Sequence, residues 1–264
     1  MDNLVDLTAP KLLLALAMIA ASVALSAWQR LGLTRSLLWA SLRSVLQLVF
    51  VGFLLDAVFA LKEAGVVVGI VGLMSVVAAK EATNRIQKSF PYDFWLVWAA
   101  VLVSTLTTLT YVTLLVIQPT KWYSPQYVIP LAGMILGQSM NGAAIAGERL
   151  TQALTQQVAD IETHLCLGAT PSQAIAGMRR TAIKAAMIPT INVMMVAGVV
   201  TLPGMMTGQI LSGVSPLLAV RYQLLILFAI TAADLLTTWL VTDWIGRQFF
   251  NQAQQLQTQT VARL

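Results

Sequence analysis

Several polar side chains stand inside long apolar stretches, where their type and spacing could serve transport. Arg43 and Gln47 are four residues apart and would share one face of a helix. Asp234 stands near the middle of another apolar stretch. Polar and charged groups are unfavourable inside a lipid bilayer, so each of them marks a candidate pathway for a substrate or an ion. The remaining candidates of this kind are Gln138, Ser139, Asn141 and Asn192.

A structural interpretation competes with the functional one at each of these positions. Amide and hydroxyl side chains commonly form hydrogen bonds between membrane helices. An unpaired guanidinium in hydrocarbon is strongly unfavourable, so Arg43 needs a partner, and Asp234 is the candidate. We expect an ion pair between the two, which would serve either structure or transport.

Proline and glycine interrupt the stretches that hold the amide side chains. Pro130 and Pro189 lie within them, and Pro203 with Gly204 follows. Broken helices near the centre of a membrane expose backbone groups and mark binding regions in many transporters. The pattern therefore places the translocation pathway in the neighbourhood of Asn141 and Asn192.

The sequence offers few residues for a disulfide, a metal site, nucleotide binding or catalysis. Cys166 is the single cysteine and His164 the single histidine, which argues against a disulfide within the chain, a cysteine zinc cluster and a multi-histidine metal site. The chain has no Gly-x-x-x-x-Gly-Lys-[Ser/Thr] string, so it has no phosphate-binding P-loop. We expect no catalytic residues, no enzyme activity and no bound cofactor.

A metal site is not visible in the sequence, and its ligands stay unknown. Met205 and Met206 offer thioether sulfurs close to Gln209. Thioethers suit soft metals such as Cu(I) better than iron. Apolar packing or a hydrophobic gate is the simpler role for these methionines.

Composition indicates that a membrane must position these side chains. Of 264 residues, 58% are hydrophobic and 10% are charged, against about 25% charged in a typical soluble domain. A membrane span needs about 20 apolar residues. We expect an all-α, multi-pass permease domain over residues 1–264, in contact with the lipid bilayer. Its seven predicted spans cover residues 12–28, 37–59, 64–79, 94–117, 127–147, 188–202 and 222–245.

The basic residues predict an orientation. Cytoplasmic loops of membrane proteins carry an excess of Lys and Arg. Four of the sixteen basic residues fall on one side of the predicted spans, Arg43 lies within a span, and the other eleven share the opposite side. We expect a plasma (inner) membrane protein with its N-terminus outside and its C-terminus in the cytoplasm, and no nucleic-acid partner. The eleven are Arg30, Arg35, Lys80, Arg85, Lys88, Arg149, Arg179, Arg180, Lys184, Arg247 and Arg263.

A 40-residue segment, 148–187, separates the fifth and sixth predicted spans on the cytoplasmic side. Apolar residues recur in it at helical spacing, from Leu150 to Leu165, which predicts one amphipathic helix. Gly168 suits the position after a helix C-terminus. Thr170, Pro171 and Gln173 form the pattern of a helix start with a capping box. The segment thus predicts a helix, a sharp turn and a second helix, which would rest on lipid headgroups or form a docking platform.

The motifs of this chain resemble those of ABC-importer permeases and, over almost the whole length, those of the FetB-type ABC permease family. Glu162 and Gly168 have the spacing of the Glu-Ala-Ala…Gly loop that docks into the ATPase subunit of the importers. The FetB-type resemblance is carried by GMILGQSMNG at 133–142, LGATP at 167–171, MIPTIN at 187–192, LPGMMTGQILSG at 202–213 and AVRYQ at 219–223.

The resemblance implies a seven-span permease subunit that pairs with a separate cytoplasmic ABC ATPase and exports iron or a related metal or metal complex. ATP would be used by the partner subunit. Because ABC transporters have two permease halves, it also implies a homodimer. The implied coupling residues are Asp160, Glu162, Gly168, Ala169, Thr170, Pro171, Arg179 and Arg180.

One alternative needs no ATPase. The chain would then be a secondary carrier or channel that uses Arg43 and Asp234 as a charge pair within the membrane. A chelated or organic substrate also stays open, because iron enters through the resemblance and not through a ligand set.

Overall fold

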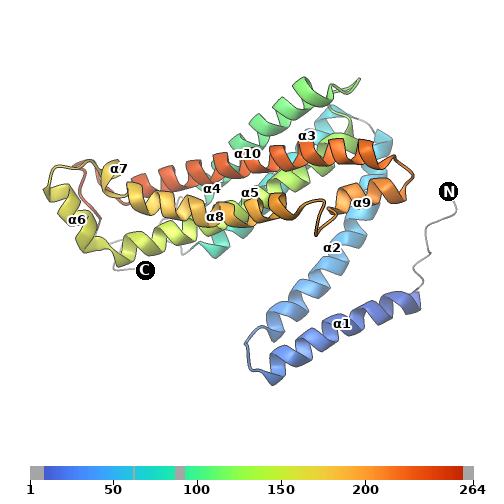
Figure 1. Ribbon diagram of the computed structural model, residues 1–264, viewed down its shortest axis with the longest axis horizontal. Helices are drawn as coiled ribbons and strands as arrows, with labels where there is room; N and C mark the ends of the chain where they lie inside the picture. The colour runs from blue at the N-terminus through green and yellow to red at the C-terminus, as the bar shows by residue number, and fades with distance from the viewer. Residues whose placement is uncertain (1–8, 62, 87–92, 258–264) are drawn as a thin grey trace. The chain divides into compact units, whose positions relative to one another are not determined.

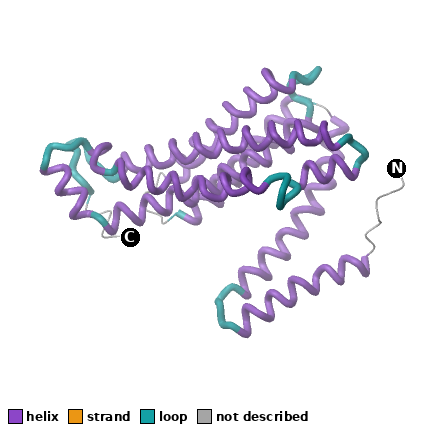
Figure 2. Tube along the Cα trace, in the orientation of Figure 1, coloured by secondary structure: helices purple, strands orange, loops and turns teal. Residues whose placement is uncertain are grey.

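The computed structural model describes residues 9–61, 63–86 and 93–257. Within these ranges the regular elements are helices, with two isolated backbone bridges (Figures 1 and 2). Five helices are long and apolar enough to cross a membrane, which confirms the all-α, multi-span prediction in outline. The chain divides into two compact units, residues 1–62 and 63–264. Lys62, Lys88 and Arg263, on which the orientation partly rests, lie outside the described residues.

The first unit is a helical hairpin. Helix α1 (Ala9–Trp28) packs against α2 (Thr34–Leu61). The turn between them needs two left-handed residues, Arg30 at φ 53° and Gly32 at φ 73°. Thr34 donates a hydrogen bond to Ser26 across this turn at 3.3 Å, so a polar contact closes the hairpin.

The second unit is a bundle built around α5 (Pro125–Gln156) and α10 (Pro216–Gln248). Helices α3 (Ala64–Arg85), α4 (Asp93–Tyr111) and α8 (Ala176–Val196) pack against this central pair. A π-helical segment, Val112–Ile117, continues α4. Glycines on α5 and α10 let neighbouring side chains approach these helices closely. A Cβ at Gly147 would lie 2.5 Å from Ile86, and one at Gly246 would lie 2.7 Å from Ile175.

Three short helices lie at the two ends of this bundle. Helices α6 (Val158–Cys166) and α7 (Pro171–Ala174) form the turn between α5 and α8. Helix α9 (Gly204–Leu211) lies at the opposite end of the unit, between α8 and α10 (Figure 1). Proline stands at the first position of α5, α7 and α10, where its missing N–H costs no helical hydrogen bond.

The expected helix interruptions at Pro130 and Pro189 are absent. Helix α5 is continuous through Pro130 and α8 through Pro189. The expectation was wrong because neighbouring helices can accommodate a proline inside a membrane helix. The chain breaks instead after Val196, so the predicted span 188–202 covers the second half of α8 and the loop that follows it.

The predicted amphipathic helix is divided into two. Helix α5 runs on to Gln156, and the chain bends at Gln157 before α6 begins. Leu150, Leu154 and Ile161 are all fully buried. The bend keeps the apolar stripe against the core where a straight helix would carry its end away from the bundle.

Candidate functional site

The carboxylate of Asp234 on α10 is an acidic group buried inside the bundle, with no exposed surface. Thr190 of α8 donates a hydrogen bond to its Oδ2 atom. The Nε2 atom of Gln138 on α5 donates in turn to Thr190 Oγ1, at 2.6 Å. A chain of two hydrogen bonds therefore joins three helices at Asp234.

The second carboxylate oxygen has different surroundings. Asp234 Oδ1 has no hydrogen-bond partner among the described residues. A Cβ at Gly142 of α5 would lie 1.8 Å from it, so this oxygen rests against the helix backbone. Ser139, one turn earlier on the same face of α5, has a buried hydroxyl that also lacks a partner in the described chain. We call Gln138, Ser139, Gly142, Thr190 and Asp234 the Asp234 cluster.

Hydroxyl groups continue this polar region along α10. Ser104 of α4 and Thr237 of α10 form a buried hydrogen bond. Thr231 donates to the sulfur of Met194 on α8 at 2.9 Å. The interfaces of α10 with α4 and α8 are therefore held by hydrogen bonds as well as by apolar packing, as is common between membrane helices.

The turn between α6 and α8 is a second candidate site. Gly168 has φ +87°, and the N–H groups of Gly168 and Ala169 donate to Leu165 and His164 carbonyls at 3.0 Å each. This is a Schellman termination, which favours glycine at the left-handed position. The predicted C-terminal glycine of the helix is thus confirmed.

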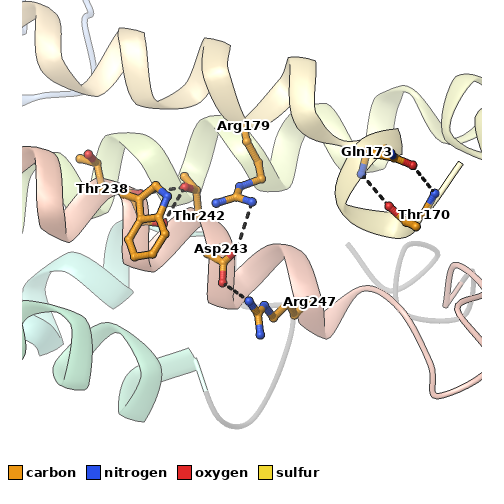
Figure 3. Close-up of polar contacts among 8 residues, drawn as sticks. Thr170, Gln173, Arg179, Thr238, Thr242, Asp243 and Arg247 are labelled. Carbon is orange, nitrogen blue, oxygen red and sulfur yellow. Dashed lines mark hydrogen bonds and ion pairs between the residues drawn. The ribbon is translucent and has the colours of Figure 1, made fainter.

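The predicted capping box is also present. The N–H of Gln173 donates to Thr170 Oγ1 at 3.4 Å, and the N–H of Thr170 donates to Gln173 Oε1 at 2.9 Å (Figure 3). Both backbone donors at the start of α7 are therefore satisfied. Glycine and capping box together fix a sharp, exposed turn.

A polar groove of about 660 Å³ runs between the end of α5, α6 and the start of α8. Arg149, Asp160 and His164 contribute charged or titratable groups to it. Asp160 and Glu162 are exposed on α6, and Ala169 and Pro171 are half-buried beside the turn. Of the eight predicted coupling residues, Asp160 lines this groove.

The two predicted coupling arginines separate. Arg180 is exposed. Arg179, with 17% of its side chain exposed, forms an ion pair at 3.0 Å with Asp243 of α10. Arg247 reaches the other oxygen of Asp243 at 2.9 Å (Figure 3). Arg179 therefore links the start of α8 to α10. Arg180 is the arginine of this pair that is exposed to a partner.

The predicted pathway residues lie in different parts of the fold. Arg43 and Gln47 belong to α2 in the first unit, so their pairing with Asp234 stays a prediction. Asn141 accepts a hydrogen bond from Arg85 of α3 at 3.4 Å. Asn192 is on the exposed side of α8. Half-buried on α9 are Met205, Met206 and Gln209.

Ser139 was a candidate from the sequence, as a polar side chain inside an apolar stretch. Sequence reasoning missed Thr190 and the contact of Gly142 with Asp234. A signal was present for Thr190, because the buried residues Ala182 and Ala186 precede it at intervals of four and define the inner face of α8. Gly142 carries no comparable signal. Within the described part of the chain, no group of three or more His, Cys, Asp or Glu side chains could hold a metal ion.

Comparison with known proteins gives one family. Residues 9–250 match the family described as "Uncharacterised protein family (UPF0014)". The membrane protein slr1647 of Synechocystis, which bears the same family name, is 52% identical over 91% of this chain and 93% of its own length.

Two further relatives carry more descriptive names. "Probable iron export permease protein FetB" of Escherichia coli is 33% identical over 95% of each chain. "Protein ALUMINUM SENSITIVE 3" of Arabidopsis thaliana is 31% identical over 92% of this chain and 88% of its own. No solved structure matches the chain. The apolar helices and these relatives together identify a multi-pass membrane protein.

Proposed function

This chain belongs to the UPF0014 family, and on that premise we propose that it is the permease subunit of an ABC transporter, without enzyme activity of its own. A separate cytoplasmic ATPase subunit binds and hydrolyses the ATP. The observation that carries the proposal is the fixed turn at Gly168 and Thr170 beside the polar groove. Such a turn presents the same surface in every transport cycle, as a coupling element must.

We propose a membrane arrangement with seven crossings, made by the five long apolar helices together with α1 and α8. The N-terminus then faces outward, and the C-terminus and the helix-turn-helix of α6 to α8 face the cytoplasm of the plasma (inner) membrane. Lys and Arg residues support this orientation, because Arg149, Arg180 and Lys184 all border the turn.

We infer a homodimer, because an ABC transporter needs two permease halves. Gly65 and Gly69 on α3 have open space where a Cβ would stand. They lie four residues apart, the spacing at which small residues let membrane helices approach one another. Their open surroundings support a contact outside this chain.

The substrate that best fits is iron or a related metal or metal complex, moved out of the cytoplasm. Its support is the name of the Escherichia coli relative, at 33% identity over nearly the whole chain. The described residues contain no group of three or more His, Cys, Asp or Glu side chains that could hold a metal ion, so the proposed path has no resident metal cage among them.

The coupling proposal is tested by reconstituting the permease with the ATPase encoded nearest to its gene. Gly168→Leu places a side chain at φ +87° and should reduce both co-purification of the ATPase and stimulated ATP hydrolysis. Gly213→Leu is the matched control, since Gly213 has φ +91° and equally open surroundings but follows α9 at the other end of the bundle. Unchanged ATPase binding and hydrolysis in Gly168→Leu would contradict the proposal.

A secondary carrier or channel is the second candidate, and the unpaired oxygen of buried Asp234 is the observation that favours it. Measuring iron flux into inside-out vesicles distinguishes an ABC permease from a secondary carrier or channel. An ABC permease gives flux that requires the ATPase and ATP, whereas a carrier gives flux from the permease alone.

A further inference from the structure

The two oxygens of the Asp234 carboxylate are used unequally. Oδ2 accepts the hydrogen bond from Thr190, which is itself held by Gln138. Oδ1 has no partner among the described residues, although the residue is fully buried. A buried ionised carboxylate is strongly unfavourable unless a positive charge accompanies it. The chemistry of this position therefore calls for one positive charge at Oδ1.

Among the described residues of the second unit, the helices that pack on α10 place no basic side chain at this level. Helices α4, α5, α7, α8 and α9 all contact α10. On α5, Glu148 and Arg149 come more than a turn after Gly142, and on α8 Lys184 comes more than a turn before Thr190. Helices α7 and α9 contain no titratable side chain. The other titratable groups on these elements stand near helix ends: Asp93, Tyr111, Tyr127, Arg179, Arg180, Arg221, Tyr222, Asp243 and Arg247.

The Asp234 cluster offers too few oxygen ligands for a metal ion. A hard cation takes about six oxygen ligands at roughly 2.0–2.6 Å. In this cluster the oxygens without a partner among the described residues are Asp234 Oδ1 and Ser139 Oγ. Oδ1 also packs closely against α5, since a Cβ on Gly142 would lie 1.8 Å from it. Two free oxygens do not make a coordination shell.

A proton neutralises the charge and needs no coordination shell. We propose that Asp234 is a proton-binding site within the membrane bundle, at which Oδ1 takes up and releases one proton. The step is the simple addition of H⁺ to the carboxylate to give the carboxylic acid. Thr190 continues to donate to Oδ2 in both states. The hydroxyl of Ser139, three residues before Gly142 on α5, is the other buried group of the cluster without a partner among the described residues.

Proton binding at this point acts on α8. Thr190 and Arg179 lie on the same helix and contact α10 through Asp234 and Asp243 respectively. Helix α8 begins directly after the α6–α7 turn. Changing the charge on Asp234 changes the strength of the Thr190 hydrogen bond, and hence the hold of α10 on the helix that follows the turn. The proton site stands on geometry alone and does not depend on the proposed ATPase partner.

The test is infrared difference spectroscopy on the purified full-length protein in lipid, between high and low pH. We expect a carbonyl band of a protonated carboxyl group that grows as the pH falls and is lost in Asp234→Asn. The control is Asp160→Asn, which removes an exposed carboxylate of α6 and should keep the band. The measurement needs no ATPase and no substrate, so its result can be interpreted even if the coupling experiment fails.

A second pair of variants covers the case in which Asp234→Asn does not fold. Thr190→Val removes the hydrogen bond to Oδ2 and should shift the band, whereas Thr190→Ser keeps the hydroxyl and should leave it in place. A pH-dependent band that neither shifts in Thr190→Val nor depends on Asp234 would overturn the proposal, as would the absence of any such band. Loss of the band on adding Mn²⁺ or Na⁺ at constant pH would overturn it in favour of a metal site.

Discussion

The Oδ1 atom of Asp234 lies against the backbone of Gly142, so closely that a Cβ there would stand 1.8 Å away. The same Cβ would lie 3.0 Å from the Thr238 methyl group. Glycine is thus the residue that lets α5 and α10 meet around a buried carboxylate, and a larger residue fits only if the Asp234 side chain or one of the helices moves.

Gly142→Ala should therefore destabilise the protein. Overpacking of this kind costs about 1–3 kcal/mol, which exceeds the roughly 0.5–1 kcal/mol that alanine contributes to a helix relative to glycine. We expect a lower midpoint of thermal unfolding in detergent, followed by tryptophan fluorescence. Gly137→Ala is the control on the same helix, because nothing lies within 4 Å of its added Cβ. Equal midpoints for the two variants would show that Asp234 moves freely.

Part of this architecture could be predicted from the sequence, because local patterns determine it. Long apolar stretches predict membrane helices, and the Thr170 and Gln173 spacing predicts a capping box that the structure contains. Asp234 was identified as deep because it stands far from the ends of its apolar stretch. Each of these features depends on residues close together in the chain.

What could not be predicted depends on which helix faces meet. Thr190 and Gly142 acquire their roles through contact with Asp234, which is 44 residues from Thr190, and no local period reports that contact. The interruptions expected at Pro130 and Pro189 are wrong, since α5 and α8 continue through these prolines within the bundle. Arg179 is a predicted coupling residue, but it pairs with Asp243, 64 positions away in the chain, and no local pattern indicates that contact.

Asp243→Asn should weaken the hold of α8 on α10. The variant leaves the Arg179 guanidinium, which is only 17% exposed, without its counter-charge, and this costs about 1–3 kcal/mol. Arg247→Ala removes the other partner of Asp243, but that side chain is 77% exposed, so the loss should stay below about 1 kcal/mol. Urea or thermal unfolding of both variants gives the comparison. A larger loss in Arg247→Ala would reverse this ranking of the two pairs.

Thr170→Ala should loosen the turn before α8 without unfolding the bundle. Loss of an N-cap side chain costs about 0.5–2 kcal/mol, and here the effect is confined to a four-residue helix. We expect faster amide hydrogen exchange at residues 170–175 and unchanged exchange in α5 and α10. Thr170→Ser keeps the capping oxygen and should exchange like the wild type. Equal exchange in the alanine variant would mean that the turn is held by its packing and not by the cap.

The single cysteine offers a direct test of orientation. Cys166 is exposed at the end of α6, so a membrane-impermeant maleimide reaches it only from the side that holds the turn. With the turn in the cytoplasm, inside-out vesicles should label and intact cells should not.

A matched probe reports on the opposite end of the bundle. Ser212 is exposed at the end of α9, and Cys166→Ser combined with Ser212→Cys moves the label there. This variant should label in intact cells, because α9 and α6 lie at opposite ends of the second unit (Figure 1). Labelling of Cys166 in intact cells would place the turn outside and remove the basis for ATPase coupling, whatever the fold of the segment.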